Sequence, residues 1–327
     1  MKKAIVTGGG GFIGSHMVDL LLKKNFKVVV IDNFTGGHIN NLSQHKKNKK
    51  LKIIKKDINN LSSYIKNFSK THYVFHFAGI GDIVPSINRP LDYLTTNIYG
   101  TIKILEACRK YKIKKFVYAA SSSCYGMTKK NTNEKYPINN KHPYALSKYL
   151  GEKSVLHWGK IYKVPVNSIR IFNAYGPRVR TTGAYGAAIG VFFKQKLANK
   201  PLTIVGNGKQ TRDFAHVKDV VRAFYLAAIS KYINKIYNLG SGRTVTVNKL
   251  ADYIGGKKIF IPERPGEPKS SSANISKIKK DLNWKPKISF EEGIKNLLKD
   301  INKWKDAPLW TPIKIKRSTK NWFKYIR

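Results

Sequence analysis

A glycine-rich turn near the start of the chain constrains its fold more than any other feature. Residues 7–14 read Thr-Gly-Gly-Gly-Gly-Phe-Ile-Gly and directly follow the apolar residues Ala4-Ile5-Val6. A short strand, this turn and a helix expected over residues 12–24 form the opening of a strand–helix–strand unit. Such units assemble into parallel sheets that are covered by helices on both faces.

The rest of the first half repeats this alternation of apolar runs and helix-like segments. Further strands are expected at residues 28–31, 51–54, 73–77, 116–120 and 164–171, and helices over 91–111 and 143–162. Continuous apolar strands separated by helices predict a doubly wound parallel α/β sheet over residues 1–172. The regularity then ends, so we expect a smaller, discontinuous lobe over 173–300, with residues 214–240 returning to the main sheet. Residues 301–327 form a basic, aromatic extension.

The glycine turn and an acid after the second strand predict a dinucleotide site. Gly8, Gly11 and Gly14, with Phe12 and Ile13 between them, let a pyrophosphate approach the backbone at a helix N-terminus. Asp32 ends the second strand, where a carboxylate binds both ribose hydroxyls of NAD and repels the 2′-phosphate of NADP. Only 18 of the 327 residues are acidic, so an acid at this place is informative. We therefore expect NAD, against the alternatives of a plain turn and a capping Asp.

Other expected cofactor contacts follow the neighbouring strands. Asp57 and Ile58, after the third strand, suit the adenine end, and the end of the fourth strand brings bare backbone near the dinucleotide. Asp57 and Gly79 are also ordinary turn residues. The full additional set of expected cofactor contacts is Asn33, Asp57, Ile58, Phe77, Ala78, Gly79, Asn97, Tyr144 and Lys148.

Tyr144 and Lys148 stand four residues apart, so both lie on one face of the expected helix. Lys148 and a positively charged nicotinamide are expected to lower the phenol pKa from ~10 toward the working pH. Tyr144 would then act as a general base toward a sugar hydroxyl. Ser121, at the end of strand 116–120, would hydrogen-bond the oxygen of that sugar hydroxyl and pass its proton to Tyr144. No metal site is expected.

Five motifs in this order carry a family resemblance: Thr7–Gly14, Ser121–Gly126, Tyr144–Lys148, Arg170–Pro177 and Arg212–Phe214. Over residues 3–300 the chain resembles the extended short-chain dehydrogenase/reductase family, specifically its nucleotide-sugar epimerases and dehydratases. The resemblance implies a Rossmann domain with a smaller C-terminal substrate-binding lobe, a tightly held NAD and a homodimer.

The residues after Ser121 favour one branch of that family. Similar 4,6-dehydratases carry an Asp-Glu pair after the catalytic Thr, and similar decarboxylases carry a Glu two positions after it, whereas Ser122 and Ser123 follow here. Neither hydroxyl serves readily as a base at C5. The run resembles C4-epimerases that act on UDP-N-acetylglucosamine, as do residues 81–86 and 183–188. Dehydration, decarboxylation, C2 epimerisation and a non-catalytic NAD- or RNA-binding role stay open as alternatives.

The same resemblance implies a UDP-sugar substrate. Arg212 and Arg264 match the positions that clamp the diphosphate, a task that suits the bidentate guanidinium group. Ser122, Ser123 and Asn173 match substrate contacts. Ser271 stands where similar epimerases carry a small residue if they accept N-acetylated sugars, so we expect UDP-N-acetylglucosamine, UDP-N-acetylgalactosamine or their uronic acids. Plain surface arginines are the alternative for Arg212 and Arg264.

The formal net charge of +44 is mostly a lysine background, because 51 of the 62 basic residues are lysines and they are scattered. We expect a solvated lysine surface and no specific nucleic-acid partner. No apolar run approaches the ~20 residues of a spanning helix, so no membrane insertion is expected. Two cysteines make no disulfide framework, which favours the cytoplasm. Residues 301–327 are expected to dock on the body or a partner subunit, with a membrane-surface segment as the alternative.

Overall fold

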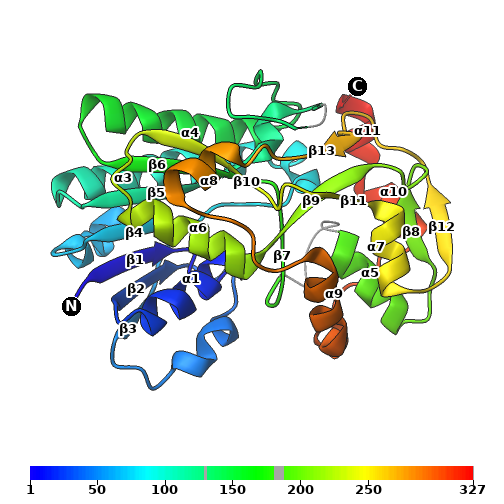
Figure 1. Ribbon diagram of the computed structural model, residues 1–327, viewed down its shortest axis with the longest axis horizontal. Coiled ribbons are helices and arrows are strands. Elements are labelled where there is room, and N and C mark those ends of the chain that lie inside the picture. The colour runs from blue at the N-terminus through cyan, green and yellow to red at the C-terminus, as the bar shows by residue number, and fades with distance from the viewer. Residues whose placement is uncertain (129–130, 180–187, 327) are drawn as a thin grey trace.

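A parallel sheet with helices on both faces makes up the larger part of the computed structural model, which describes residues 1–128, 131–179 and 188–326 (Figure 1). In these residues seven strands pair in parallel in the order β10-β6-β5-β4-β1-β2-β3. They are β1 (Lys3–Thr7), β2 (Lys27–Asp32), β3 (Leu51–Lys55), β4 (Tyr73–His76), β5 (Lys115–Ser121), β6 (Val166–Ile171) and β10 (Lys235–Leu239). The predicted doubly wound α/β fold is confirmed.

The strand order reverses between β1 and β4, and this position selects the binding edge of the sheet. From β1 the chain adds β2 and β3 toward one edge of the sheet. It then returns to the other side of β1 and adds β4, β5, β6 and β10 toward the opposite edge. Ligands of open parallel sheets bind outside the carboxyl ends of the strands at such a switch point. Gly8, Asp32, Phe77 and Ser121 all stand at carboxyl ends, on β1, β2, β4 and β5. The topology therefore brings the predicted cofactor and catalytic residues to one edge.

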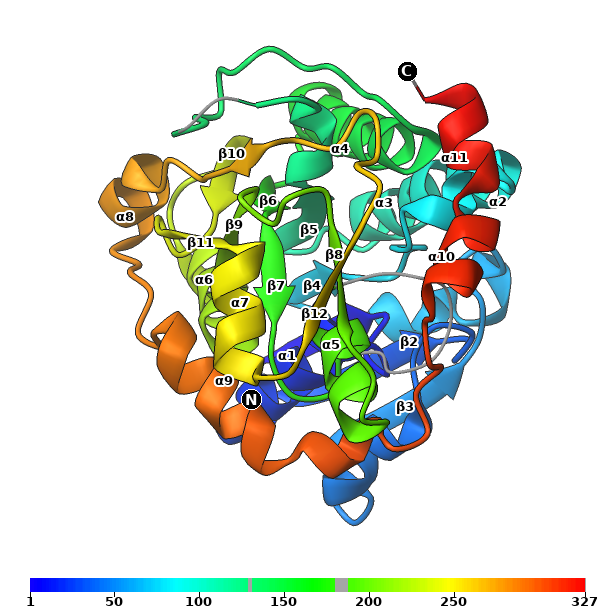
Figure 2. The same ribbon diagram turned by 90° about the vertical axis from the view of Figure 1, so that its right-hand side faces the viewer.

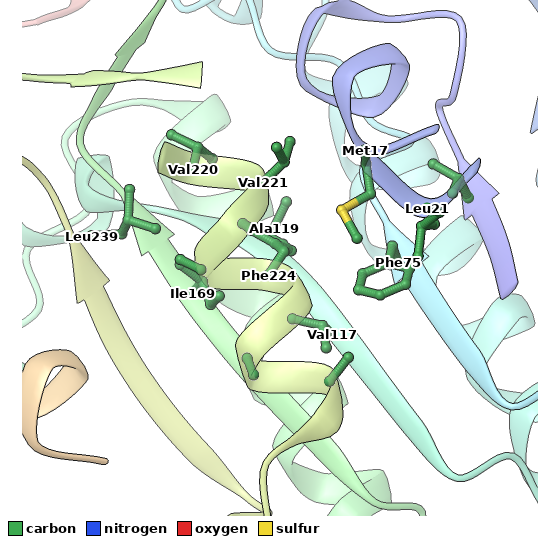
Figure 3. Close-up of a cluster of buried hydrophobic side chains, with 14 of the residues drawn as sticks. Met17, Leu21, Phe75, Val117, Ala119, Ile169, Val220, Val221, Phe224 and Leu239 are labelled. Carbon is green, nitrogen blue, oxygen red and sulfur yellow. The ribbon is translucent and has the colours of Figure 1, made fainter. Parts of the chain in front are cut away.

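Two pairs of helices cover the sheet. α1 (Phe12–Lys23) packs beside α6 (Val217–Ile229) on one face, and α3 (Thr101–Lys110) packs beside α4 (Pro143–Ile161) on the other. Figure 3 shows the buried core under the first pair, where Met17 and Leu21 of α1 and Phe224 of α6 lie over the strands.

The helix expected over residues 91–111 is not one regular helix. α2 (Pro90–Leu94) and α3 are separated by a π-helical turn, Thr95–Gly100. The spacing of the apolar residues did not distinguish this turn from α-helix. Single π-helical turns occur often at functional sites, and this one carries Asn97.

The smaller lobe is built around β9, which pairs with β7, β11 and β13, while β8 pairs with β12. Helices α5, α7 and α9 cover its separate hydrophobic core. The strands are β7 (Asn173–Tyr175), β8 (Leu202–Val205), β9 (Thr211–His216), β11 (Thr244–Thr246), β12 (Lys258–Ile261) and β13 (Ser270–Ser271). The helices are α5 (Ala188–Leu197), α7 (Val247–Ile254) and α9 (Phe290–Lys299), and α8 (Ser276–Leu282) packs on the main body beside β10.

The C-terminal segment lies against the body of the chain. Trp304 is buried in the core of the smaller lobe, and Trp322 is buried farther along. After the 3₁₀ turn that ends at Trp304, α10 (Pro312–Ser318) and α11 (Lys320–Tyr325) run along the side of the molecule (Figure 2). Helix α11 packs against the 3₁₀ turn Val84–Ile87 that precedes α2 (Pro90–Leu94). Among the described residues, no helix has the length and apolar character needed to cross a membrane.

Candidate active site

The glycine turn forms a cradle that side chains would fill. Gly8 has φ +70°, and a Cβ there would lie 2.6 Å from the amide nitrogen of Ala78. A Cβ on Gly14 would lie 2.1 Å from the carbonyl oxygen of Gly8. Helix α1 begins after Gly11 without a side-chain cap, so its first amide groups face the turn. This geometry fits the pyrophosphate of a dinucleotide.

Asp32 lies beside this turn. Its carboxylate accepts hydrogen bonds from the backbone amides of Gly10 at 2.8 Å and Phe34 at 2.7 Å. Burial raises the pKa of Asp32 above its usual value, although both amides oppose this effect. Each carboxylate oxygen has capacity for a further hydrogen bond, so the position fits the ribose hydroxyls of NAD.

Of the residues expected near the adenine, Asp57 lies at the strand ends, whereas Ile58 lies in the core. The amide of Asn33 donates to Asp57 at 2.7 Å, so these two side chains join the ends of β2 and β3. The side chain of Ile58 instead lies in the core beneath α3, where a Cβ on Gly100 would contact it. An adenine contact through the side chain of Ile58 is therefore not supported, because its apolar surface is already covered by the protein.

The segment after β4 lies between the glycine turn and α4. Phe77 packs on Phe224, with ring centroids 4.6 Å apart, and Ala78 lies against Gly8. A Cβ on Gly79 would lie 3.8 Å from Nζ of Lys148, so the lysine reaches this segment.

Asn97 fastens that segment to α4. Its amide nitrogen donates to the carbonyl oxygen of Ile80 at 3.1 Å and to Oγ of Ser147 at 2.9 Å, and its oxygen accepts from the amide of Ile80 at 2.9 Å. The side chain is buried. Asn97 therefore organises the loop, and its contact with the cofactor stays a prediction.

A histidine that the sequence analysis missed lies under this loop. His76 is fully buried between the hydroxyls of Thr7 at 2.7 Å and Thr101 at 2.9 Å. Burial lowers its pKa to about 3, so the ring is neutral at pH 7. A histidine inside an apolar strand shows no partner in the sequence, and only the fold reveals both threonines.

The predicted catalytic residues come together from β5 and α4. The phenol of Tyr144 lies near the side chain of Ser121, which lowers its pKa. Oγ of Ser121 also lies 3.1 Å from Oγ of Ser123, within hydrogen-bond distance. Nζ of Lys148 lies 4.5 Å from the ring centroid of Tyr118, on the side of Gly79. Ser121, Tyr144 and Lys148 thus surround the carboxyl ends of β4 and β5.

In the chain without its cofactor the pKa of the Tyr144 phenol is not lowered, and the expected fall beside a bound nicotinamide stays a prediction. Burial raises the pKa of Tyr144, and the hydrogen bond from Ser121 only partly opposes this. Burial also lowers the pKa of Lys148 to about 7, against the effect of Glu152. Lys148 is therefore only partly charged at neutral pH. Burial thus reduces the positive charge that Lys148, one helical turn from Tyr144, was expected to place beside the phenol.

Three neighbours of Tyr144 were not predicted. The imidazole of His142 stacks on its ring with centroids 6.0 Å apart and planes 8° apart, and Tyr93 meets it edge-on at 6.4 Å. The negative charge of Asp82 also raises the pKa of Tyr144. Asp82 was detectable in the sequence, since it is one of few acids and lies in the loop 81–86 that the family resemblance singled out.

Arg212 and Arg264 lie together in the smaller lobe. The carboxylate of Glu267 stands between them, 2.7 Å from Nη2 of Arg264 and 3.8 Å from Nη2 of Arg212. Ser271 pairs with Arg212 in the register of β13 and β9. Arg212 and Glu267 also line a pocket of about 260 Å³ beside β8. Arg212 lines this pocket, and Arg264 is joined to it through the shared carboxylate of Glu267. Two guanidinium groups this close fit a diphosphate.

The strand register links this cluster to the catalytic edge. Ser121 pairs with Ile171 at the end of β6, and Asn173 follows in β7, which pairs with β9. The amide of Asn173 donates to the carbonyl oxygen of Asp213 at 3.1 Å, next to Arg212. Ser122 and Ser123 form the turn directly after Ser121. Of the motif 183–188, residues 183–187 lie outside the described residues.

This fold and this set of side chains define an enzyme of the nucleotide-binding Rossmann class. The family described as GDP-mannose 4,6 dehydratase matches residues 5–297, and the chain belongs to it. No cluster of three or more metal-ligating side chains occurs in the part of the chain that the structure describes.

Known relatives and solved structures agree with this assignment. A putative UDP-glucose 4-epimerase from Methanocaldococcus jannaschii is 38% identical over 303 residues, which cover 90% of this chain and 96% of the relative. The UDP-N-acetylglucosamine 4-epimerase from Methanobrevibacter ruminantium M1, in complex with UDP-N-acetylmuramic acid, has a TM-score of 0.86 and 33% identity, with 93% and 98% of the two chains covered. The UDP-glucuronic acid 4-epimerase from Bacillus cereus, in complex with UDP-glucuronic acid and NAD, has a TM-score of 0.85 and 32% identity, with 92% and 99% covered. The resemblance to nucleotide-sugar epimerases and dehydratases, and NAD as the cofactor, are confirmed.

Proposed function

We propose that this chain is a C4-epimerase of a UDP-sugar, working through a transient 4-keto sugar. The observation that carries the proposal is that Tyr144 and Ser121 lie together at the carboxyl edge of the sheet. The two residues after Ser121 are Ser122 and Ser123, so no acidic residue follows it directly. Such a site can move a proton at one sugar hydroxyl but offers no base in the turn after Ser121 for a second carbon.

Each group of residues has a defined task in this proposal. Ser121 and Tyr144 remove the proton of the 4-hydroxyl and later return it. NAD, when bound at the glycine turn and Asp32, supplies a hydride acceptor and then a donor for C4. Arg212 and Arg264 hold the diphosphate while the sugar turns about its phosphate linkage, so that C4 presents either face. Below pH 7, where Lys148 is mostly protonated, it favours the phenolate most strongly.

We further propose that the sugar is N-acetylated. Ser271 has a short side chain in register with Arg212, so it leaves volume beside the expected diphosphate for a 2-acetamido group. The comparison with the Methanobrevibacter ruminantium enzyme supports this class of sugar, and the comparison with the Bacillus cereus enzyme supports including uronic acids.

A second reaction on the same scaffold, dehydration or decarboxylation, is favoured by Asp82. Its carboxylate is close enough to Tyr144 to raise the phenol pKa, so it is the candidate base if a proton must leave C5. Mass spectrometry separates these reactions, because epimerisation conserves mass while the others lose water or carbon dioxide.

The purified protein with a panel of UDP-sugars, read by proton NMR and mass spectrometry, tests the proposal. A C4 epimer of unchanged mass is expected. Tyr144→Phe should lower kcat by about 10²- to 10⁴-fold, since it removes the general base. Tyr162→Phe, at an exposed tyrosine that follows the last turn of α4, is the matched control. A product that has lost mass, or near-normal turnover by Tyr144→Phe, would contradict the proposed reaction.

A homodimer and a cytoplasmic location also stay proposals. Exposed Leu91, Tyr99, Leu146 and Leu150 lie on neighbouring helical segments around α2 and α4, which suits burial against a second copy. Both cysteines are free and buried, as suits a reducing compartment. Sedimentation equilibrium at micromolar concentration checks the dimer, and a monomer would overturn it.

A further inference from the structure

Helix α11 lies against the loop that carries Arg264. Trp322 in this helix is only 3% exposed, and its indole nitrogen Nε1 donates a hydrogen bond to the carbonyl oxygen of Pro265 at 2.8 Å. Pro265 directly follows Arg264. A Cβ on the next residue, Gly266, would lie 2.5 Å from Cγ2 of Ile326, so the end of the chain fits closely over the same loop.

One histidine lies between the Trp322 ring and Tyr144. The rings of Trp322 and His142 have centroids 5.5 Å apart, and His142 stacks on Tyr144. Nδ1 of His142 also accepts the backbone amide of Ala145 at 3.2 Å and so caps the helix that carries Tyr144. Burial lowers the pKa of His142 to about 4, so the stacked ring is neutral at pH 7.

Helix α11 also holds the loop that follows β4. Trp322 and Ile326 form one small apolar cluster with Val84, and Ile87 packs against it. The amide of Asn321 donates to the side chain of Asn88 at 2.7 Å. One helix of the C-terminal segment therefore contacts the arginine loop, the start of α4 and the loop after β4 (Figure 2).

We propose that Trp322 is a positioning residue that couples the diphosphate clamp to Tyr144, an inference that rests on the proposed function. Its indole N–H fixes the loop of Arg264 through Pro265, and its ring fixes His142 and thereby the phenol of Tyr144. The two actions use different parts of the side chain. Separate substitutions should therefore separate an effect on nucleotide affinity from an effect on turnover.

Three single variants of the full chain, with NAD present, make this test. Trp322→Phe keeps a ring against His142 but loses the N–H, so the Kd of UDP in calorimetry should rise about 5-fold, as for one lost hydrogen bond, with a smaller loss of kcat than in His142→Asn. His142→Asn keeps a good helix cap but removes the stacked ring. It should lower kcat and shift its pH profile while the Kd of UDP stays unchanged. Phe323→Ala, at a 45% exposed neighbour, is the control and should change neither quantity.

Equal UDP affinity for Trp322→Phe and wild type would overturn the proposal, as would an unchanged pH profile for His142→Asn. A change of the same size in Phe323→Ala would overturn it too, because the helix would then act only through general stability. UDP binding needs no turnover. A wild-type protein that binds UDP but epimerises no sugar would therefore sink the proposed reaction and leave the Trp322→Phe comparison intact. A wild-type protein that does not bind UDP would overturn both.

Discussion

At the scale of single residues, the chemistry of Tyr144 depends on a contest between burial and hydrogen bonding. Burial raises the pKa of the phenol, the charges of Asp82 and Cys124 add to this, and the hydrogen bond from Ser121 opposes it. Ser121 is therefore the group of the chain itself that most directly favours the phenolate. Its value to the reaction should be visible in the dependence of rate on pH.

Ser121→Ala should move the rising limb of the kcat/KM–pH profile toward alkaline pH. Loss of the hydroxyl removes an interaction that lowers the pKa of Tyr144, so a smaller fraction of the phenol is ionised at any given pH below that pKa. At pH 7 the rate should fall by about 10-fold or more. Ser121→Thr keeps a hydroxyl and should restore most of the rate. A lower rate with an unmoved profile would show that Ser121 acts in another way.

Ser271→Tyr should change the choice of sugar. The larger side chain fills space next to Arg212, so turnover of the N-acetylated UDP-sugar should fall about 10-fold or more relative to that of the plain sugar. Competition between the two substrates, read by NMR, gives the ratio of kcat/KM directly. Ser271→Ala keeps the volume and should keep the wild-type ratio. Equal loss for both sugars in Ser271→Tyr would point to damage of the clamp and not to selectivity.

Residues in short, ordered motifs were predictable, and residues that depend on distant partners were not. Gly8, Asp32 and Tyr144 belong to patterns whose spacing reflects a turn, a strand end or one helix face. His142 and Trp322 meet only because the last helix returns to the start of α4. No local pattern records such a contact.

At the scale of elements, α4 is the part of the structure on which the site most depends. Lys148 and Glu152 follow Tyr144 at intervals of one turn on the same helix. Glu152 is buried with Arg170, with Oε1 and Nη2 2.5 Å apart, and it also accepts from Ser168. This contact pins the middle of the helix to β6. At Gly151, the residue before Glu152, there is no space for a side chain.

Gly151→Ala should push α4 away from the sheet. A Cβ there would lie 2.4 Å from Oη of Tyr118 and 2.6 Å from the carbonyl oxygen of Asn97. Since the second contact is backbone, the helix must shift, and we expect a lower melting temperature together with a loss of kcat of about 10-fold or more. Gly190→Ala in α5, whose nearest contact is at 3.4 Å, is the matched control and should be neutral or slightly stabilising. Normal turnover by Gly151→Ala would show that Tyr144 tolerates movement of its helix.

The elements of the main sheet were easier to predict than those of the smaller lobe. Strands buried on both faces appear as unbroken apolar runs, as in β2 and β5. Strands such as β11 and β13 have only three and two residues of mixed polarity, and their pairing with β9 is set by contacts across the lobe. The sequence pattern therefore showed a lobe but not its internal order.

At the scale of the whole molecule, the few acids are used where the fold needs them. Both carboxylate oxygens of Asp213 accept backbone or hydroxyl groups of residues 241–242 and Ala273. Asp219 accepts the amides of Lys287 and Ile288. Asp213 thus ties these loops to β9 of the smaller lobe, and Asp219 ties the segment before α9 to α6 on the main sheet. In a chain of net charge +44, these two carboxylates are therefore used to connect parts of the fold.

Acid should weaken the folded state through histidines whose pKa values are lowered by burial. Burial lowers the pKa of His76 to about 3 and those of His142 and His216 to about 4, against an ordinary value of 6.5. Between about pH 4 and 6.5 the unfolded chain therefore binds more protons than the folded one, so the free energy of unfolding falls as pH is lowered through this window. Urea unfolding at pH 7.5, 6 and 5 measures the fall.

The raised pKa values of Asp32 and Asp213 make the free energy of unfolding rise as pH is lowered, which opposes the effect of the histidines. A comparison of variants therefore tests the histidines better than the wild type alone. His216→Asn keeps a side chain able to cap α6 but cannot titrate, and it should reduce the loss of stability between pH 7.5 and 5 by on the order of 1 kcal/mol. His157→Asn, at an exposed histidine on α4, should leave the pH dependence of the wild type unchanged. If both variants lost stability in parallel with the wild type, His216 would not be the group that takes up the proton, and the acid sensitivity would have to come from other groups such as His16, His76 and His142.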